Sequence, residues 1–151
     1  MNPDLQDLYQ QMIMDHNKNP RNFRVMPDAT SVAEGFNPLC GDHLHVYIKM
    51  KNGRIEDVSF EGDGCAISKA SASMMTGILK GKTGGEAKAL FEEVRAMLSR
   101  DVNSPVDTEK LGKLAVFAGV CEFPSRVKCA SLAWHTMVEG LEPTGKQVTT
   151  E

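Results

Sequence analysis

The chain has 151 residues, carries a formal net charge of −3 and is 41% hydrophobic, which suits one packed domain. It has no basic stripe and no apolar run near the ~20 residues of a membrane span. These features argue against a nucleic-acid partner and against a protein embedded in a membrane. The first residues lack the basic and then apolar profile of a secretory signal. We therefore expect a single domain over residues 1–151 and a cytoplasmic location.

The first third of the chain predicts one helix followed by irregular backbone. Asn2 and Pro3 form a helix start signal, a capping residue and then a proline in the first turn. Asn19-Pro20 ends that helix. Residues 21–39 show no regular period, with room for one short strand over 31–36.

Two strands are predicted next, over residues 43–50 and 54–61, where apolar and polar residues alternate. Asn52-Gly53 between them is a strong hairpin signal. A hairpin pairs its strands in opposite directions, so the sheet is expected to be antiparallel, with about three strands.

The second half of the chain changes to a helical period. Thr83 and Glu86 fit a capping box, and Pro124 is placed for the first turn of a helix. Helices are expected over residues 66–80, 84–98 and 108–118 and from 124 onward. The predicted fold class is α+β, a small antiparallel sheet packed against helices.

The residues before the first predicted hairpin strand raise a chemical question. Asp42 and Cys40 share strand parity with Leu44 and the apolar residues that follow, so they point where the core side chains point. A bare carboxylate in an apolar core is costly. The opposite parity falls to His43 and His45, which we expect to face away, in solvated or packing roles.

Three of the four cysteines fall at the ends of predicted elements. Cys40 precedes a strand, Cys65 joins a strand to a helix, and Cys129 lies in the first turns of the last helix. Helix starts favour thiolate, and Arg126 and Lys128 add positive charge beside Cys129.

Three thiols and one carboxylate suit a tetrahedral metal ion, zinc first. A cation would also explain why Asp42 faces inward. The simpler interpretation is that the cysteines are buried, unreactive thiols. We keep that interpretation for Cys121, which no local feature activates.

Four motifs together resemble the SufU branch of the IscU/NifU-N superfamily of iron–sulfur biogenesis proteins, over nearly the whole chain. They are DHNKNPRNF at 15–23, NPLCGD at 37–42, FEGDGCAISKASASMMT at 60–76 and FPSRVKCASLAWH at 123–135. The resemblance implies metal ligands at Cys40, Asp42, Cys65 and Cys129, and matches no ligand to Cys121. It also implies the SufU/IscU-like fold.

The resemblance implies that the protein binds Zn2+ and accepts persulfide sulfur from a SufS-type, PLP-dependent cysteine desulfurase for a downstream iron–sulfur assembly complex. The alternative is a scaffold that holds a transient iron–sulfur cluster on the same residues; a third interpretation is an interaction module with a structural zinc. IscU proteins carry His where this chain has Lys128, which favours the first. Cys40 is the expected acceptor because its loop can move, with Cys129 next. Arg126 and Lys128 are expected to contact the desulfurase.

Overall fold

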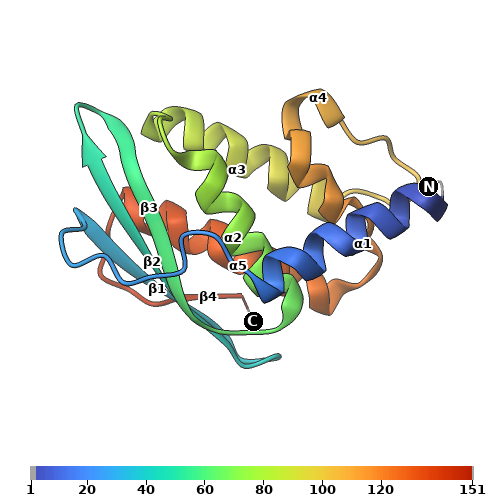
Figure 1. Cartoon of the computed structure of the whole chain (residues 1–151), viewed down its shortest axis with the longest axis horizontal. Helices are drawn as coiled ribbons and strands as arrows, with labels where there is room; N and C mark the ends of the chain where they lie inside the picture. Colours follow the sequence, from blue (N-terminus) through green and yellow to red (C-terminus); the bar gives the residue numbers. More distant parts are fainter. Residues whose placement is uncertain (1–2, 151) are drawn as a thin grey trace.

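A four-stranded sheet in the order β3-β2-β1-β4 forms one side of the computed structural model, which describes residues 3–150 (Figure 1). Strand β2 (Asp42–Lys51) pairs antiparallel with β1 (Ser31–Asn37) and with β3 (Arg54–Asp63). This confirms the predicted antiparallel core of the sheet. A two-residue strand, β4 (Val148–Thr149), adds to the free edge of β1 in parallel, so the whole sheet is mixed.

The β2–β3 hairpin turns at the predicted dipeptide. Asn52 and Gly53 both have positive φ, 54° and 76°, which is the backbone that a tight two-residue turn needs. The register of this hairpin alternates the core and solvent faces of β2 as expected, with Leu44, Val46 and Ile48 fully buried.

Two helices cover one face of the sheet, α2 (Ala66–Leu79) against β3 and α5 (Pro124–Leu141) against β1 and β2 (Figure 1). A further tier packs on these helices, α1 (Pro3–Lys18) on α2 and α3 (Gly84–Ser99) on α5. The predicted Asn2 cap of α1 lies outside the described residues. The buried core lies between the sheet and α2 and α5.

The helix ends follow local signals in most places. Thr83 and Glu86 form the predicted capping box of α3. The predicted helix over 108–118 is wrong in type: α4 covers only Thr108–Leu111, and a 3₁₀ segment, η1, continues over Gly112–Glu122. Gly112 breaks the α-helix with φ of 53°, and the run of buried residues after it has no polar face to set a helical period.

None of the helices in the described part of the chain is long and apolar enough to cross a membrane.

Candidate metal centre

Asp42 is the first residue of β2, and its side chain is fully buried on the core face of the sheet, as the strand parity predicts. Two donors hold the carboxylate: the Cys65 backbone N–H reaches Oδ1 at 2.8 Å and Asn37 Nδ2 reaches Oδ2 at 3.1 Å. Hydrogen bonds of this kind lower the cost of a buried carboxylate without removing it. The two hydrogen bonds fix the position of the carboxylate. Both donors are neutral, so neither balances its negative charge.

Two thiols approach each other beside this carboxylate. Cys129 Sγ, buried on α5, lies 3.3 Å from Cys40 Sγ, which is exposed in the turn between β1 and β2. Gly41 follows Cys40 with φ of 74°, a conformation that costs glycine little. Ligand atoms of Cys40, Asp42 and Cys129 all lie within 4.8 Å of one another.

Cys65 lies next to this group but is not one of the three residues whose ligand atoms all lie within 4.8 Å of one another. It is the N-cap of α2, and its sulfur accepts the Ser68 N–H at 3.5 Å. Its backbone also donates to Asp42, so the start of α2 is tied to the start of β2. The Cys65 side chain also interacts with Cys129, whose pKa it helps to raise.

The electrostatics of Cys129 differ from the prediction. Burial raises the pKa of the Cys129 thiol well above its ordinary value, and the neighbouring Cys40, Asp42 and Cys65 raise it further. The expected help from the helix start is absent because Cys129 is the sixth residue of α5 and is only 2% exposed. A buried thiol beside a carboxylate and two further thiols favours a bound proton, or a cation in its place.

The donor set fits a tetrahedral cation. Zn–S bonds of about 2.3 Å place two ligand sulfurs roughly 3.8 Å apart, near the 3.3 Å between Cys40 and Cys129. The site is also closely packed: a Cβ on Gly64 would come within 3.0 Å of Asp42 Oδ1. A side chain larger than glycine at position 64 would therefore crowd Asp42.

Asn37 is a site residue to which the sequence analysis gave no role. It ends β1, is fully buried, and lies directly opposite Asp42 in the β1–β2 ladder. Its Nδ2 donates to Asp42 and approaches Cys129 Sγ at 3.5 Å. A hairpin drawn between the predicted strands at 31–36 and 43–50 would have indicated this pairing.

The remaining cysteine and two of the histidines lie in other contacts. Cys121 accepts a hydrogen bond from Arg100 at 3.3 Å and does not belong to the group of Cys40, Asp42 and Cys129. His135 meets the Phe91 ring edge to face, and His16 bonds to Ser73 on α2. Cys121 is only partly buried, and its interpretation as a packing thiol stays a prediction.

The two basic residues near Cys129 lie at the start of α5. Arg126 is exposed, with its guanidinium 4.9 Å from the centre of the Phe123 ring, and Lys128 is half-buried directly before Cys129. Both lie on the same helix as Cys129, within three residues of it in the sequence.

The cluster of thiols and a carboxylate lies where the turn between β1 and β2 meets the start of α2 and the first turns of α5. Residues 8–130 match the family model described as the NifU-like N-terminal domain, and the chain belongs to that family. Its similarity to SufU-type proteins is confirmed as well. It is 41% identical over 143 residues to the zinc-dependent sulfurtransferase SufU of Bacillus subtilis, covering 93% of both chains.

Other relatives carry scaffold names. The iron–sulfur cluster assembly scaffold protein IscU of Streptococcus pyogenes is 38% identical, with 91% of this chain and 85% of that protein covered. A crystal structure described as an iron–sulfur cluster assembly scaffold protein for the SUF system, from Fervidobacterium islandicum, superposes with a TM-score of 0.81 at 35% identity. That match covers 91% of this chain and 98% of the other. This chain is therefore similar both to a relative named as a sulfurtransferase and to proteins named as scaffolds.

Proposed function

We propose that this protein is a zinc-dependent sulfur acceptor that takes persulfide sulfur from a SufS-type cysteine desulfurase and passes it to iron–sulfur cluster assembly. Zinc is held by Cys40, Asp42, Cys65 and Cys129, and Cys40 is the acceptor thiol. The sulfurtransferase name of the B. subtilis relative supports the first part of this proposal. The ligand and acceptor assignments rest on the geometry of the site.

The observation that carries the acceptor assignment is the unequal exposure of the two paired thiols. Cys40 is exposed in a turn, whereas Cys129 is 2% exposed in a helix and Cys65 is committed to the cap of α2. A sulfur acceptor has to leave its ligands and reach into a second active site. Cys40 can do so by movement of a short turn, whereas Cys129 would have to carry α5 with it.

The transfer is a thiol exchange that balances without an added oxidant. The Cys40 thiolate attacks the outer sulfur of the desulfurase persulfide, a new S–S bond forms on Cys40, and the desulfurase cysteine leaves as a thiolate. Zinc supplies the chemistry of keeping thiol ligands deprotonated at neutral pH. Cys65, Cys129 and Asp42 stay in place while Cys40 turns outward, and Asn37 holds the carboxylate.

The surface around Cys40 suits a protein partner. Leu39, 61% exposed, precedes the acceptor, and Phe123, 47% exposed, carries Arg126 on its ring. Exposed apolar groups beside a positive charge are typical of contact surfaces. The desulfurase is accordingly proposed to dock over Leu39, Phe123 and Arg126, with Lys128 at the edge of the contact.

A second candidate function is supported by the scaffold names of the relatives and by the ligand set. Three thiolates and a carboxylate would hold a transient iron–sulfur cluster loosely, because such clusters are ordinarily held by thiolates. A loosely held cluster can be given away. The sulfur acceptor is preferred because Lys128, and not a histidine, precedes Cys129.

The experiment is a single turnover of the desulfurase with this protein in its native metal state, followed by mapping of persulfides with mass spectrometry. Metal content is measured on the same sample. Zinc at one per chain and persulfide on Cys40 is the expected result. The matched variant is Cys121→Ser, which should accept sulfur as the unmodified protein does because Cys121 is outside the site.

The other possible results contradict either the acceptor residue or the proposed function. Persulfide on Cys129 or Cys65 with Cys40 unmodified overturns the acceptor assignment. Iron and acid-labile sulfide in the native protein, with no persulfide on any cysteine, favours the scaffold. Zinc without persulfide on any cysteine leaves the structural-zinc interpretation.

A further inference from the structure

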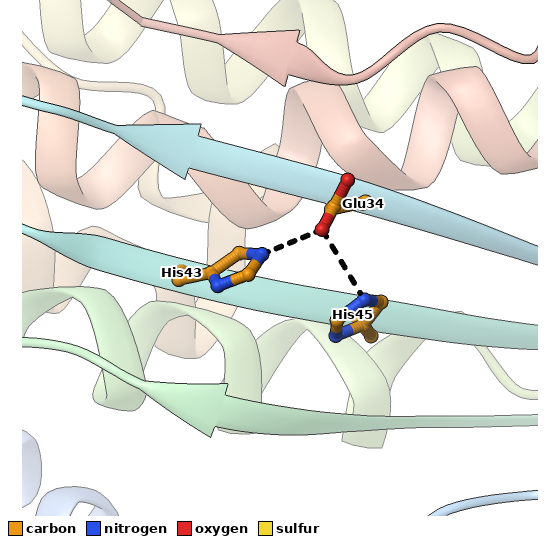
Figure 2. A group of neighbouring side chains, drawn as sticks. All are labelled: Glu34, His43 and His45. Atoms are coloured by element: carbon orange, nitrogen blue, oxygen red, sulfur yellow. Dashed lines mark hydrogen bonds and ion pairs between the residues drawn. The ribbon is translucent and has the colours of Figure 1, made fainter.

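The outer face of the sheet carries a second group of ligand-type side chains that the proposed function does not use. Figure 2 shows Glu34 on β1 and His43 and His45 on β2, with their side chains converging on the side of the sheet away from the helices. A ligand atom from each lies within 4.8 Å of the other two. The group is separated from the thiol site by the sheet itself, since His43 faces outward where its neighbour Asp42 faces inward.

The register of the sheet explains why these residues meet. Glu34 lies directly opposite His45 in the β1–β2 ladder, and His45 lies directly opposite Glu61 in the β2–β3 ladder. His43 is two residues from His45, so it shares the same face. Cross-strand and diagonal neighbours on one face are within side-chain reach. The four side chains are therefore placed by the backbone pairing and not by chance rotamers.

The three converging atoms have the spacing of metal ligands. Glu34 Oε2 lies 2.7 Å from His43 Nε2 and 3.5 Å from His45 Nε2 (Figure 2). Bonds of about 2.0–2.2 Å from a zinc ion to imidazole nitrogen and carboxylate oxygen place tetrahedral ligands roughly 3.3–3.6 Å apart. The separation of Glu34 and His45 lies in that range, and the hydrogen-bonded pair of Glu34 and His43 has to open by less than about 1 Å to admit an ion. The imidazoles are 46% and 33% exposed, so an ion can reach them from solvent.

Independent support comes from what the other nitrogen of His45 does. His45 Nδ1 pairs with Glu61 Oε1 at 2.9 Å, and the Tyr47 hydroxyl donates to the same oxygen at 3.3 Å. A carboxylate on Nδ1 places the proton there and leaves the Nε2 lone pair aimed at Glu34. This carboxylate–histidine arrangement is the usual support behind a metal-bound imidazole. His43 is steadied on its other side by the Phe36 ring, edge to face at 5.9 Å.

We propose that Glu34, His43 and His45 form a second metal site, for a divalent first-row transition ion, supported by Glu61 and Tyr47. Two imidazoles and one carboxylate suit zinc, iron(II), nickel or copper and leave coordination positions open to solvent. The site binds its ion independently of the thiol cluster. A simple surface ion-pair group would hold the same residues together without any affinity for a metal.

The test follows the four imidazoles of the chain by NMR during zinc addition. Full-length, ¹⁵N-labelled protein is first given one equivalent of zinc, and a second equivalent is then added. His43 and His45 are expected to shift together, whereas His16 and His135, held in contacts on other elements, stay unmoved. Because the readout is on imidazoles, it is separate from the sulfur transfer that tests the proposed function.

Matched variants remove ligands without touching the core. Glu34→Gln removes a ligand, and Glu56→Gln makes the same change at an exposed carboxylate on β3 outside the group. We expect the first to abolish the imidazole shifts and the second to preserve them. Glu61→Gln should weaken zinc binding by about 10- to 100-fold, as loss of an outer partner does at other sites. Unmoved His43 and His45 signals, equal shifts at all four histidines, or unchanged binding by Glu34→Gln would each overturn the proposal.

Discussion

The Cys40 sulfur lies 3.3 Å from the Cys129 sulfur, although the two residues are 89 positions apart in the sequence and differ completely in exposure. The pair joins an exposed turn to the buried face of a helix. Asp42 lies beside both, bonded to Asn37 and to the start of α2. One ion bound here would therefore connect β1, β2, α2 and α5.

Metal removal should destabilise the protein for that reason. An ion that binds only the folded state, at a free concentration of about 100 times its Kd, adds about 2.7 kcal/mol to the free energy of unfolding. For a chain of this length that corresponds to a drop of about 5–10 °C in Tm on chelation. Calorimetry of the zinc-loaded and chelated protein measures it, and hydrogen exchange should increase most over residues 38–42. An unchanged melt after verified zinc removal would contradict the prediction.

Replacement of Asn37 tests the positioning of the carboxylate. Asn37→Leu leaves Asp42 Oδ2 without its donor and should lower the free energy of unfolding by about 1–3 kcal/mol. Zinc affinity should fall by about 10- to 100-fold, because a second contact that orients a ligand is lost. Denaturant unfolding and competition with a zinc indicator measure the two effects. Asn103→Leu, at an exposed loop position, is the control; equal losses in both variants would remove Asn37 from the site.

Strand parity made Asp42 predictable, because side chains two residues apart on a strand share a face and the strand does extend back to position 42. The hairpin at Asn52-Gly53, the α+β class and the helices that begin at 66, 84 and 124 were predictable from turn and capping residues in the same way. Each of these features depends on residues that are neighbours in the sequence, so the sequence alone is enough to predict it. The single domain over residues 1–151 stays a prediction.

Other features depend on tertiary contacts that leave no local pattern. Asn37 gains its role from the residue opposite it in the sheet. The raised pKa of Cys129 comes from burial beside Asp42 and two thiols, none of them close in sequence. Strand β4 is only two residues long, so no period marks it, and it exists because the edge of β1 is there to pair with.

The stability of the metal-free protein should fall as the pH drops below neutrality. Burial holds the pKa of His135 below its ordinary 6.5, with Arg95 lowering it further, and burial and Arg21 do the same to His16. In the unfolded chain both return to 6.5, so below that pH the unfolded state takes up protons that the folded state refuses. The contribution is complete above pH 6.5 and is lost as the pH falls through the folded-state pKa values.

Denaturant unfolding between pH 5.5 and 7.5, with a chelator present, measures this dependence. His135→Gln and His16→Gln should each flatten it, and the double variant should flatten it most. A slope that is the same in the double variant and the unmodified protein would show that other groups cause it.

Charge reversal at Arg126 tests the proposed docking surface. The guanidinium is exposed over Phe123 at the start of α5, where it can pair with acidic groups of a desulfurase. Arg126→Glu should raise the apparent KM for this protein in the desulfurase reaction by roughly 2- to 10-fold, the range of one or two exposed ion pairs. Its maximal rate and zinc content should not change, because no atom of the thiol site is altered. The effect should shrink at high salt, which screens an exposed charge pair.

Lys51→Glu supplies the matched control, since it makes the same charge change at the end of β2 farthest from Asp42. Both substitutions make the net charge more negative by the same amount, so any change in long-range attraction is common to both, and only the excess effect in Arg126→Glu reports contact. Steady-state kinetics at two ionic strengths separates the two contributions. Equal KM values for the two variants would place the desulfurase elsewhere, and a loss of zinc from Arg126→Glu would mean that the start of α5 positions Cys129 rather than a partner.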